Sequence, residues 1–131
     1  MNSLLQKFET GKAPQAIGPY SQAVAAGEYL FVSGQIPIDP ATGKLIEGEI
    51  KEQAAQVLDN LEAILEAFGI GFDRVVKTEV YLKDINNFGA VNEVYASRFT
   101  HDIKPARQAM QVAKLPMDAT VEISCIAYTG R

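Results

Sequence analysis

The pattern of apolar and polar positions is most regular between residues 50 and 68. Apolar side chains recur there at steps of three and four, with charged and amide side chains between them. This spacing gathers the apolar side chains on one face, so it predicts an α-helix over Ile50–Phe68. Gly69 follows at the position where a left-handed C-terminal cap is usual. A shorter pattern of the same spacing predicts a second helix over Phe88–Phe99, which ends before Pro105.

The other apolar segments are short, and most are rich in β-branched or aromatic residues and bounded by turn-forming residues. The predicted strands are Gln6–Thr10, Tyr29–Ser33, Arg74–Leu82, Ala106–Val112 and Thr120–Tyr128. Between the second strand and the first helix, closely spaced glycines and prolines predict a turn-rich loop. The order of strands, helix, strand, helix and two strands favours an α+β fold with both helices on one face of a sheet.

The last predicted strand separates its residues into two faces by strict alternation. We expect one set to meet the helices, namely Val121, Ile123, Cys125 and Ala127. The other set is Glu122, Ser124, Ile126 and Tyr128. This second face is too apolar to be left fully in water and too polar to be a core. Such a face is often a subunit interface, so the sequence predicts a homo-oligomer.

Arg107 and Glu122 are the most informative polar residues, because they lie on the last two predicted strands. The turn between these strands, Lys114–Ala119, is centred near the midpoint of the pair. If the strands form an antiparallel hairpin, the two side chains are nearly opposite on one face and line an intersubunit cleft. An arginine suits a bidentate hold on a substrate carboxylate, and a nearby glutamate can orient water or transfer a proton. The alternative is a cross-strand ion pair with only a structural role.

Length and composition fit one domain, residues 1–131, whose core needs no disulfide or metal. The hydrophobic fraction of 47% and the charged fraction of 21% are those of an ordinary soluble globular protein. The apolar stretches are too short to span a bilayer, and polar residues near the N-terminus argue against an export signal. Cys125 is the sole cysteine, so no intrachain disulfide can form and we expect a cytoplasmic location.

Charge and metal-ligand content argue against two further classes of protein. The formal net charge is -4 and no run of lysine or arginine occurs, so nucleic acid is a poor candidate for a partner. The single histidine, His101, lies in a polar stretch, which gives no His/Cys cluster for zinc and no evident histidine-based triad. We therefore expect no metal site.

Several motifs together resemble those of one known family, and they occur in the family's order. They are Ile17–Ala23, Val32–Pro37, Val91–Tyr95, Pro105–Arg107, Leu115-Pro116 and Val121–Ile123. On these motifs the chain resembles the RidA family, also called YjgF-type proteins, over nearly its whole length from about Lys12 onward. The resemblance implies a chorismate-mutase-like fold with one mixed sheet. It also implies a homotrimer whose sheets face a central barrel and whose three sites lie at the subunit interfaces.

The activity that the resemblance implies is hydrolysis of reactive enamines and imines, such as 2-iminobutanoate and 2-iminopropanoate, to 2-oxo acids and ammonia. This reaction protects pyridoxal-phosphate enzymes and uses no metal or organic cofactor. By resemblance, Arg107 binds the substrate's α-carboxylate, and Glu122 positions or activates the water that attacks the imine carbon.

The resemblance also implies further pocket residues. Tyr20 is similar to the family's pocket tyrosine, and Ser33 and Gly34 resemble its pocket edge. A half-buried core tyrosine and a tight turn after a strand are the respective alternatives for Tyr20 and Gly34. Asn92 also matches a family position. The equally good alternative is that its side-chain amide, on the face of a helix, only bonds nearby backbone groups. Many members carry cysteine where this chain has Ala109, whose backbone groups can still line the pocket.

Three functions remain open from the sequence. The first is the imine deaminase. The second is a non-catalytic module that uses the same carboxylate pocket to sense a 2-oxo acid or an amino acid. The third, a ribonuclease or translation inhibitor, has no visible basic groove or stacking platform to support it.

Overall fold

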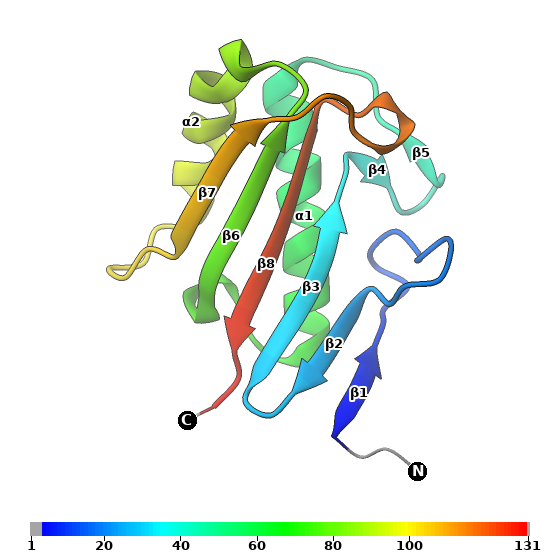
Figure 1. Ribbon diagram of the computed structural model, residues 1–131, viewed down its shortest axis with the longest axis vertical. Helices are drawn as coiled ribbons and strands as arrows, with labels where there is room; N and C mark the ends of the chain where they lie inside the picture. Colours follow the sequence, from blue (N-terminus) through cyan, green and yellow to red (C-terminus); the bar gives the residue numbers. More distant parts are fainter. Residues whose placement is uncertain (1–3, 131) are drawn as a thin grey trace.

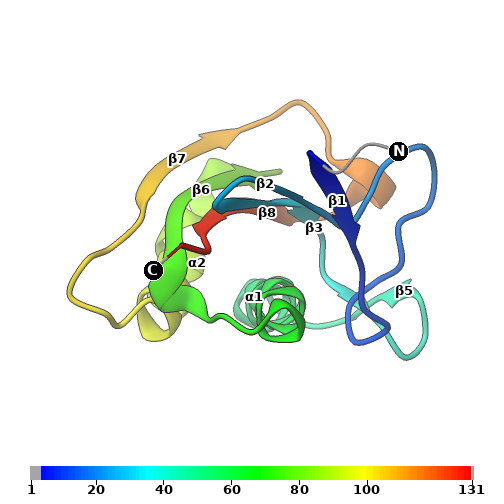
Figure 2. The same cartoon turned by 90° about the horizontal axis from the view of Figure 1, so that it is seen from below.

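A six-stranded mixed sheet with two helices packed on one of its faces forms the protein (Figure 1). The structure is a computed structural model and describes residues 4–130. Seen from below, both helices lie on the same side of the curved sheet, and the other face is uncovered (Figure 2). The α+β class and the placement of the helices are therefore confirmed, whereas the trimer with a central barrel stays a prediction.

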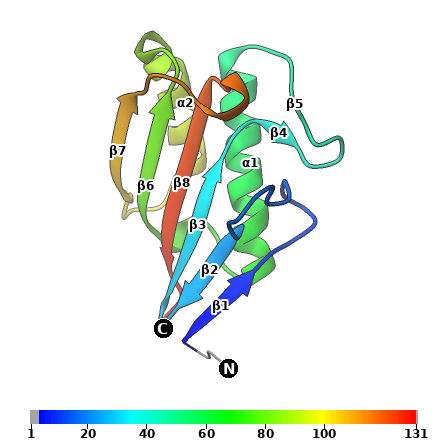
Figure 3. The same cartoon turned by 45° about the vertical axis from the view of Figure 1, so that its right-hand side comes forward.

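The main sheet contains β1 (Leu5–Phe8), β2 (Ala23–Ala26), β3 (Tyr29–Gln35), β6 (Val75–Leu82), β7 (Ala106–Gln111) and β8 (Val121–Tyr128). Their order is β1-β2-β3-β8-β6-β7, with β7 at one edge and β1 at the other (Figure 3). The helices are α1 (Ile50–Phe68) and α2 (Phe88–Arg98). In the turn-rich loop, β4 (Ile38–Asp39) and β5 (Lys44–Leu45) form a second, two-stranded sheet. Short 3-10 turns span Phe72–Arg74, Ile85–Asn87 and Pro116–Asp118.

Helix α1 supplies much of the core, as its apolar spacing predicts. Its fully buried apolar side chains are Ala54, Val57, Leu58, Leu61, Ile64 and Leu65. Gly69 ends the helix in the left-handed region, with φ at 94°. The N–H of Ile70 donates to the carbonyl of Leu65 at 3.0 Å, and the N–H of Gly69 donates to the carbonyls of Glu66 and Leu65, so these carbonyls at the helix end are satisfied. The sequence therefore predicted both the helix and its cap.

Strand β8 confirms the predicted alternation. The residues expected to meet the helices are buried, and the alternate residues from Glu122 to Tyr128 are half-buried on the open face. The strand is hydrogen-bonded on both sides, antiparallel to β3 and to β6. It is thus a central strand rather than half of a terminal hairpin.

The predicted hairpin of the last two strands is wrong. Strand β7 pairs in parallel with β6, with Arg107 opposite Thr78, and it has no ladder with β8. Parallel neighbours need a long crossover, which α2 supplies between β6 and β7. The polar, mostly exposed sequence of β7 suits the sheet edge, whereas the apolar alternation of β8 suits the centre.

The pairing also places Arg107 and Glu122 on opposite faces of the sheet. Glu122 lies opposite Tyr81 on β6, and Arg107 lies opposite Thr78 on the same strand. Thr78 and Tyr81 are three positions apart, so their side chains point to opposite faces. Arg107 therefore lies on the face that carries α2, and Glu122 lies on the open face.

Strand β2 is the strand of the main sheet that the sequence did not predict, and the short strands β4 and β5 were predicted only as a turn-rich loop. Its four residues, Ala23–Ala26, contain a single β-branched side chain, so propensity gives little signal. It pairs with β3 and brings the preceding loop against the sheet. Within residues 4–130, neither helix is both long and apolar enough to cross a membrane.

Candidate active site

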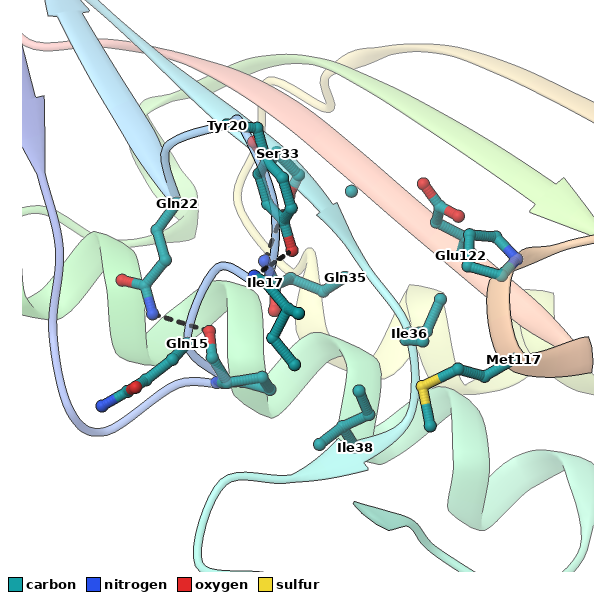
Figure 4. Close-up of a pocket in the computed structure, with 13 residues that line it drawn as sticks. Gln15, Ile17, Tyr20, Gln22, Ser33, Gln35, Ile36, Ile38, Met117 and Glu122 are labelled. Carbon is teal, nitrogen blue, oxygen red and sulfur yellow. Dashed lines mark hydrogen bonds between the residues drawn. The ribbon is translucent and has the colours of Figure 1, made fainter. Parts of the chain in front are cut away.

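A pocket of about 570 Å³ opens where β3, β8, the loop before β2 and the turn after β7 meet (Figure 4). We call it the Glu122 pocket. Its polar lining comprises Gln15, Tyr20, Gln22, Ser33, Gln35 and Glu122. Its apolar lining includes Ile17, Ile36, Ile38, Pro116 and Met117, and the Met117 side chain extends toward Ile36 and Ile38. The pocket therefore combines one carboxylate with an apolar wall, as small-molecule sites commonly do.

The Glu122 carboxylate is half-buried and carries the chemistry of this pocket. Burial raises the pKa of this carboxyl above its usual value, because water solvates the ionised form less well there. Among the described residues, no hydrogen bond or cation offsets this effect. A carboxylate in such a setting holds a proton more strongly than an exposed one, so it is suited to take a proton from water.

Gly34 allows the Glu122 carboxylate to lie directly against the backbone of β3. A Cβ atom at this position would stand 2.1 Å from Oε2 of Glu122, far closer than atoms can approach. The ladder between β3 and β8 is irregular here, with a shift between Val32 and Gln35. A side chain at position 34 would therefore force the Glu122 carboxylate to move, and Gly34 has no positive φ of the kind that a tight turn would require.

Ser33 and Gln22 hold the loop that forms one wall of the pocket. The Ser33 hydroxyl donates to the carbonyl of Ser21 at 2.6 Å, and the backbone N–H of Ser33 donates to the carbonyl of Gln22 at 2.9 Å. The buried Gln22 amide donates to the carbonyl of Pro14 at 2.7 Å and accepts from the N–H of Thr10 at 2.8 Å. The Ser33 proton is thus engaged within the protein, which leaves its oxygen as an acceptor for a ligand.

Tyr20 stands at the mouth of the pocket and is 53% exposed, so it is not a core tyrosine. Its hydroxyl accepts from the N–H of Ile17 at 3.4 Å (Figure 4). The same hydroxyl keeps its own proton available for donation to a ligand. Tyr20, Ser33, Gly34 and Glu122 therefore come together in one pocket from three separate parts of the chain.

Arg107 lies in a different pocket, of about 650 Å³, between α2 and the start of β7. We call it the Arg107 pocket, and its lining includes Asn92, Tyr95, Phe99, Lys104 and Arg107. The Nη1 of Arg107 donates to Oδ1 of Asn92 at 2.6 Å. Asn92 thus bonds the guanidinium instead of backbone, and the remaining N–H groups of Arg107 can donate to a carboxylate.

Ala109 lines neither pocket. It is half-buried opposite Val80 and packs against the core on the helix side of the sheet. Cys125 is also on the helix side, where burial raises the pKa of its thiol to about 12, so the thiol stays protonated. Within residues 4–130, no cluster of three or more His, Cys, Asp or Glu side chains is placed to hold a metal ion.

Comparison with known proteins shows what this chain is similar to. The profile of the family described as endoribonuclease L-PSP matches residues 10–129. The chain belongs to this family. The resemblance to RidA (YjgF-type) proteins drawn from the sequence motifs is therefore confirmed.

The relatives have different names. A RutC family protein of Pyrococcus horikoshii is 56% identical, covering 91% of this chain and 94% of that protein. The 2-iminobutanoate/2-iminopropanoate deaminase of the mouse is 50% identical, covering 99% of this chain and 96% of the mouse protein. The crystal structure of YyfA from Yersinia pestis, of the conserved Rid protein family, superposes with a TM-score of 0.92 at 47% identity. It covers 95% of this chain and 98% of that one.

In this RidA-family chain, the residues expected to form one site occupy two pockets, except Ala109, which lines neither. Glu122, Tyr20, Ser33 and Gly34 are together, while Arg107 and Asn92 are together elsewhere. Sequence reasoning missed Gln22, which fixes the loop, although it lies inside the Ile17–Ala23 motif. It also missed the aromatic residues of α2 around Arg107, because their helical spacing is equally typical of core positions.

Proposed function

We propose that this protein hydrolyses 2-imino acids, specifically 2-iminobutanoate and 2-iminopropanoate, to 2-oxo acids and ammonia. The observation that carries the proposal is the Glu122 carboxylate, half-buried, with a raised pKa and no donor among the described residues. It faces a pocket of a size that suits a small metabolite. The name of the mouse relative, a 2-iminobutanoate/2-iminopropanoate deaminase at 50% identity, supports the same reaction.

The chemistry requires a placed water and a route for protons. Glu122 takes one proton from water as the water oxygen bonds to the imine carbon, and the imine nitrogen takes a proton from solvent, to which a proton is returned when the carbinolamine hydroxyl ionises. In the resulting carbinolamine, the hydroxyl loses its proton, the C–N bond breaks and ammonia leaves, with Glu122 returning the proton to nitrogen. One imine and one water thus give one 2-oxo acid and one ammonia, without change in oxidation state. Tyr20 would donate a hydrogen bond at the mouth of the pocket.

Arg107 would bind the α-carboxylate of the substrate, since its guanidinium matches a carboxylate bidentately. Arg107 and Glu122 lie on opposite sheet faces within one copy, so a single copy does not form this site. We therefore propose a homotrimer in which the Arg107 pocket of one copy meets the Glu122 pocket of the next.

The open face of the sheet supports this assembly. Three large side chains lie there well exposed, Tyr29 at 44%, Phe31 at 45% and Met110 at 41%. The register of the strands places them on the same face as Glu122. A sheet face of this composition, next to an edge strand with free backbone groups, is typical of a surface that a second copy covers. We further propose that the trimer acts in the cytoplasm, where it removes imines released by pyridoxal-phosphate enzymes.

The test is to generate 2-iminobutanoate from L-threonine with a threonine dehydratase and to follow 2-oxobutanoate release. The wild type, Arg107→Ala and Glu122→Gln are compared with a reaction without added protein. Acceleration by the wild type, lost in both variants, is expected. Binding of 2-oxobutanoate without acceleration would instead identify a non-catalytic sensor. Light scattering should give three times the chain mass of 14.2 kDa.

A further inference from the structure

The ring of Tyr95 lies beside the guanidinium of Arg107, and the hydroxyl of the same tyrosine forms a buried hydrogen bond with Thr78. The Arg107 Cζ stands 4.7 Å from the centre of the Tyr95 ring. The hydroxyl of Tyr95 is 2.7 Å from Oγ1 of Thr78, and this pair is buried. Thr78 is directly opposite Arg107 in the parallel ladder, so the three side chains occupy one place on the helix side of the sheet.

One face of α2 surrounds the guanidinium. Phe88, Asn92 and Tyr95 are spaced by four and three residues, which puts them on the same side of the helix. Arg107 is 5.3 Å from the Phe88 ring and 2.6 Å from Oδ1 of Asn92. A charged side chain on an exposed edge strand would otherwise sample many rotamers. Here the two rings and the amide restrict it to one position.

Tyr95 is itself held rigidly. It is 7% exposed, and its ring stacks on Phe99 with centres 4.4 Å apart. Its hydroxyl partner, Thr78, is fully buried in β6. Packing in the core therefore fixes the position of the Tyr95 ring. The fixed ring in turn limits the movement of the Arg107 guanidinium.

We infer that Tyr95 is a positioning residue that holds Arg107 ready for a carboxylate, with Thr78 fixing the tyrosine. The inference rests on the proposed carboxylate-binding role of Arg107. A guanidinium already in place loses less conformational entropy when the ligand binds, so affinity increases. A residue that acts through Arg107 should affect carboxylate binding much more than the chemical step.

The experiment compares Tyr95→Leu, Tyr95→Phe and the control Phe72→Leu. Phe72 matches Tyr95 in burial, at 6% exposed, and its ring also lies under an arginine, Arg98, at 5.6 Å. Two quantities are measured for each variant, the Kd for 2-oxobutanoate by calorimetry and the separate kcat and KM for imine hydrolysis. Thermal unfolding gives the loss of stability of each variant.

Tyr95→Leu should raise the Kd and the KM by about 5- to 30-fold, from the strength of the cation–π contact and the regained rotamer freedom. Its kcat should stay within about threefold of the wild type. Tyr95→Phe keeps the ring but loses its bond to Thr78, so its Kd for 2-oxobutanoate should lie between those of the wild type and Tyr95→Leu. It should also unfold at a lower temperature than the wild type, because the Thr78 hydroxyl loses its partner. Phe72→Leu should lose stability without loss of affinity.

An unchanged Kd in folded Tyr95→Leu would overturn the inference. A loss of affinity in Phe72→Leu equal to that in Tyr95→Leu would also overturn it, since the effect would then be general destabilisation. If the wild type binds 2-oxobutanoate but does not accelerate imine loss, the proposed enzyme fails while the Kd comparison still tests Tyr95. A folded wild type that binds no carboxylate would overturn the inference together with the role of Arg107.

Discussion

Mixing inactive variants tests whether two copies share one site. Arg107→Ala removes the proposed carboxylate clamp, and Glu122→Gln removes the proposed base while keeping the shape of the side chain. Arg107 is exposed and Glu122 is half-buried, so neither change should prevent folding. Each variant alone should lose about 10²-fold or more of the activity, the usual range for loss of acid–base help or substrate positioning.

The expected activity of the mixture follows from the placement of the two residues on opposite sheet faces. If every site takes Arg107 from one copy and Glu122 from its neighbour, a random equal mixture has both intact residues in about 25% of its sites. The two variants are co-expressed or refolded together, and imine hydrolysis is compared with that of the unmixed proteins. Recovery to about a quarter of wild-type activity is expected.

A matched control uses the double variant, Arg107→Ala with Glu122→Gln, mixed equally with the wild type. Shared sites predict about 25% activity for this mixture as well, whereas sites contained in one copy predict about 50%. No recovery from the two single variants, together with half activity in the control, would refute the shared site. The placement of Arg107 and Glu122 on opposite sheet faces would then not determine which copies supply the catalytic residues.

Three residues on or beside β8 give simpler tests. Gly34→Ala should lower kcat about tenfold or more in steady-state assays, because the new methyl displaces the Glu122 carboxylate; an unchanged kcat would contradict this. The raised pKa of Glu122 means that its ionisation disfavours the folded state as pH rises through that pKa. Glu122→Gln should therefore melt higher than the wild type at neutral pH, with the gap closing below about pH 4, and a constant gap would exclude this origin. Cys125, its thiol pKa raised to about 12 by burial, should resist iodoacetamide until the protein unfolds, as followed by mass spectrometry.

The sequence predicted elements whose signal is local. Helix α1 and its Gly69 cap depend on neighbours within one or two turns, and the two faces of β8 depend only on alternation. The partner of β7 was predicted wrongly because strand pairing depends on the connection between strands. The sequence distance between Arg107 and Glu122 suggested a hairpin, but the crossover through α2 commits β7 to β6.

The sequence likewise predicted one part of the candidate site and not the other. The grouping of Tyr20, Ser33, Gly34 and Glu122 could be predicted, because family motifs carry long-range information that periodicity lacks. The separation of Arg107 from Glu122 could not, since a change of sheet face depends on register. The close approach of Glu122 to Gly34 is likewise a matter of tertiary packing, and nothing near position 34 in the sequence indicates it.

The hydrogen bonds around the Glu122 pocket assign different tasks to its polar residues. Gln22 bonds the carbonyl of Pro14 and the N–H of Thr10, and Ser33 bonds the carbonyl of Ser21, so both stabilise the wall. Glu122 lies half-buried with no such partner among the described residues, an arrangement that costs stability. An unpaired carboxylate beside side chains that bond the pocket wall is hard to explain as a structural feature. It is what a site needs if the carboxylate must be free to bind water and exchange a proton, and functional sites are where proteins commonly give up stability.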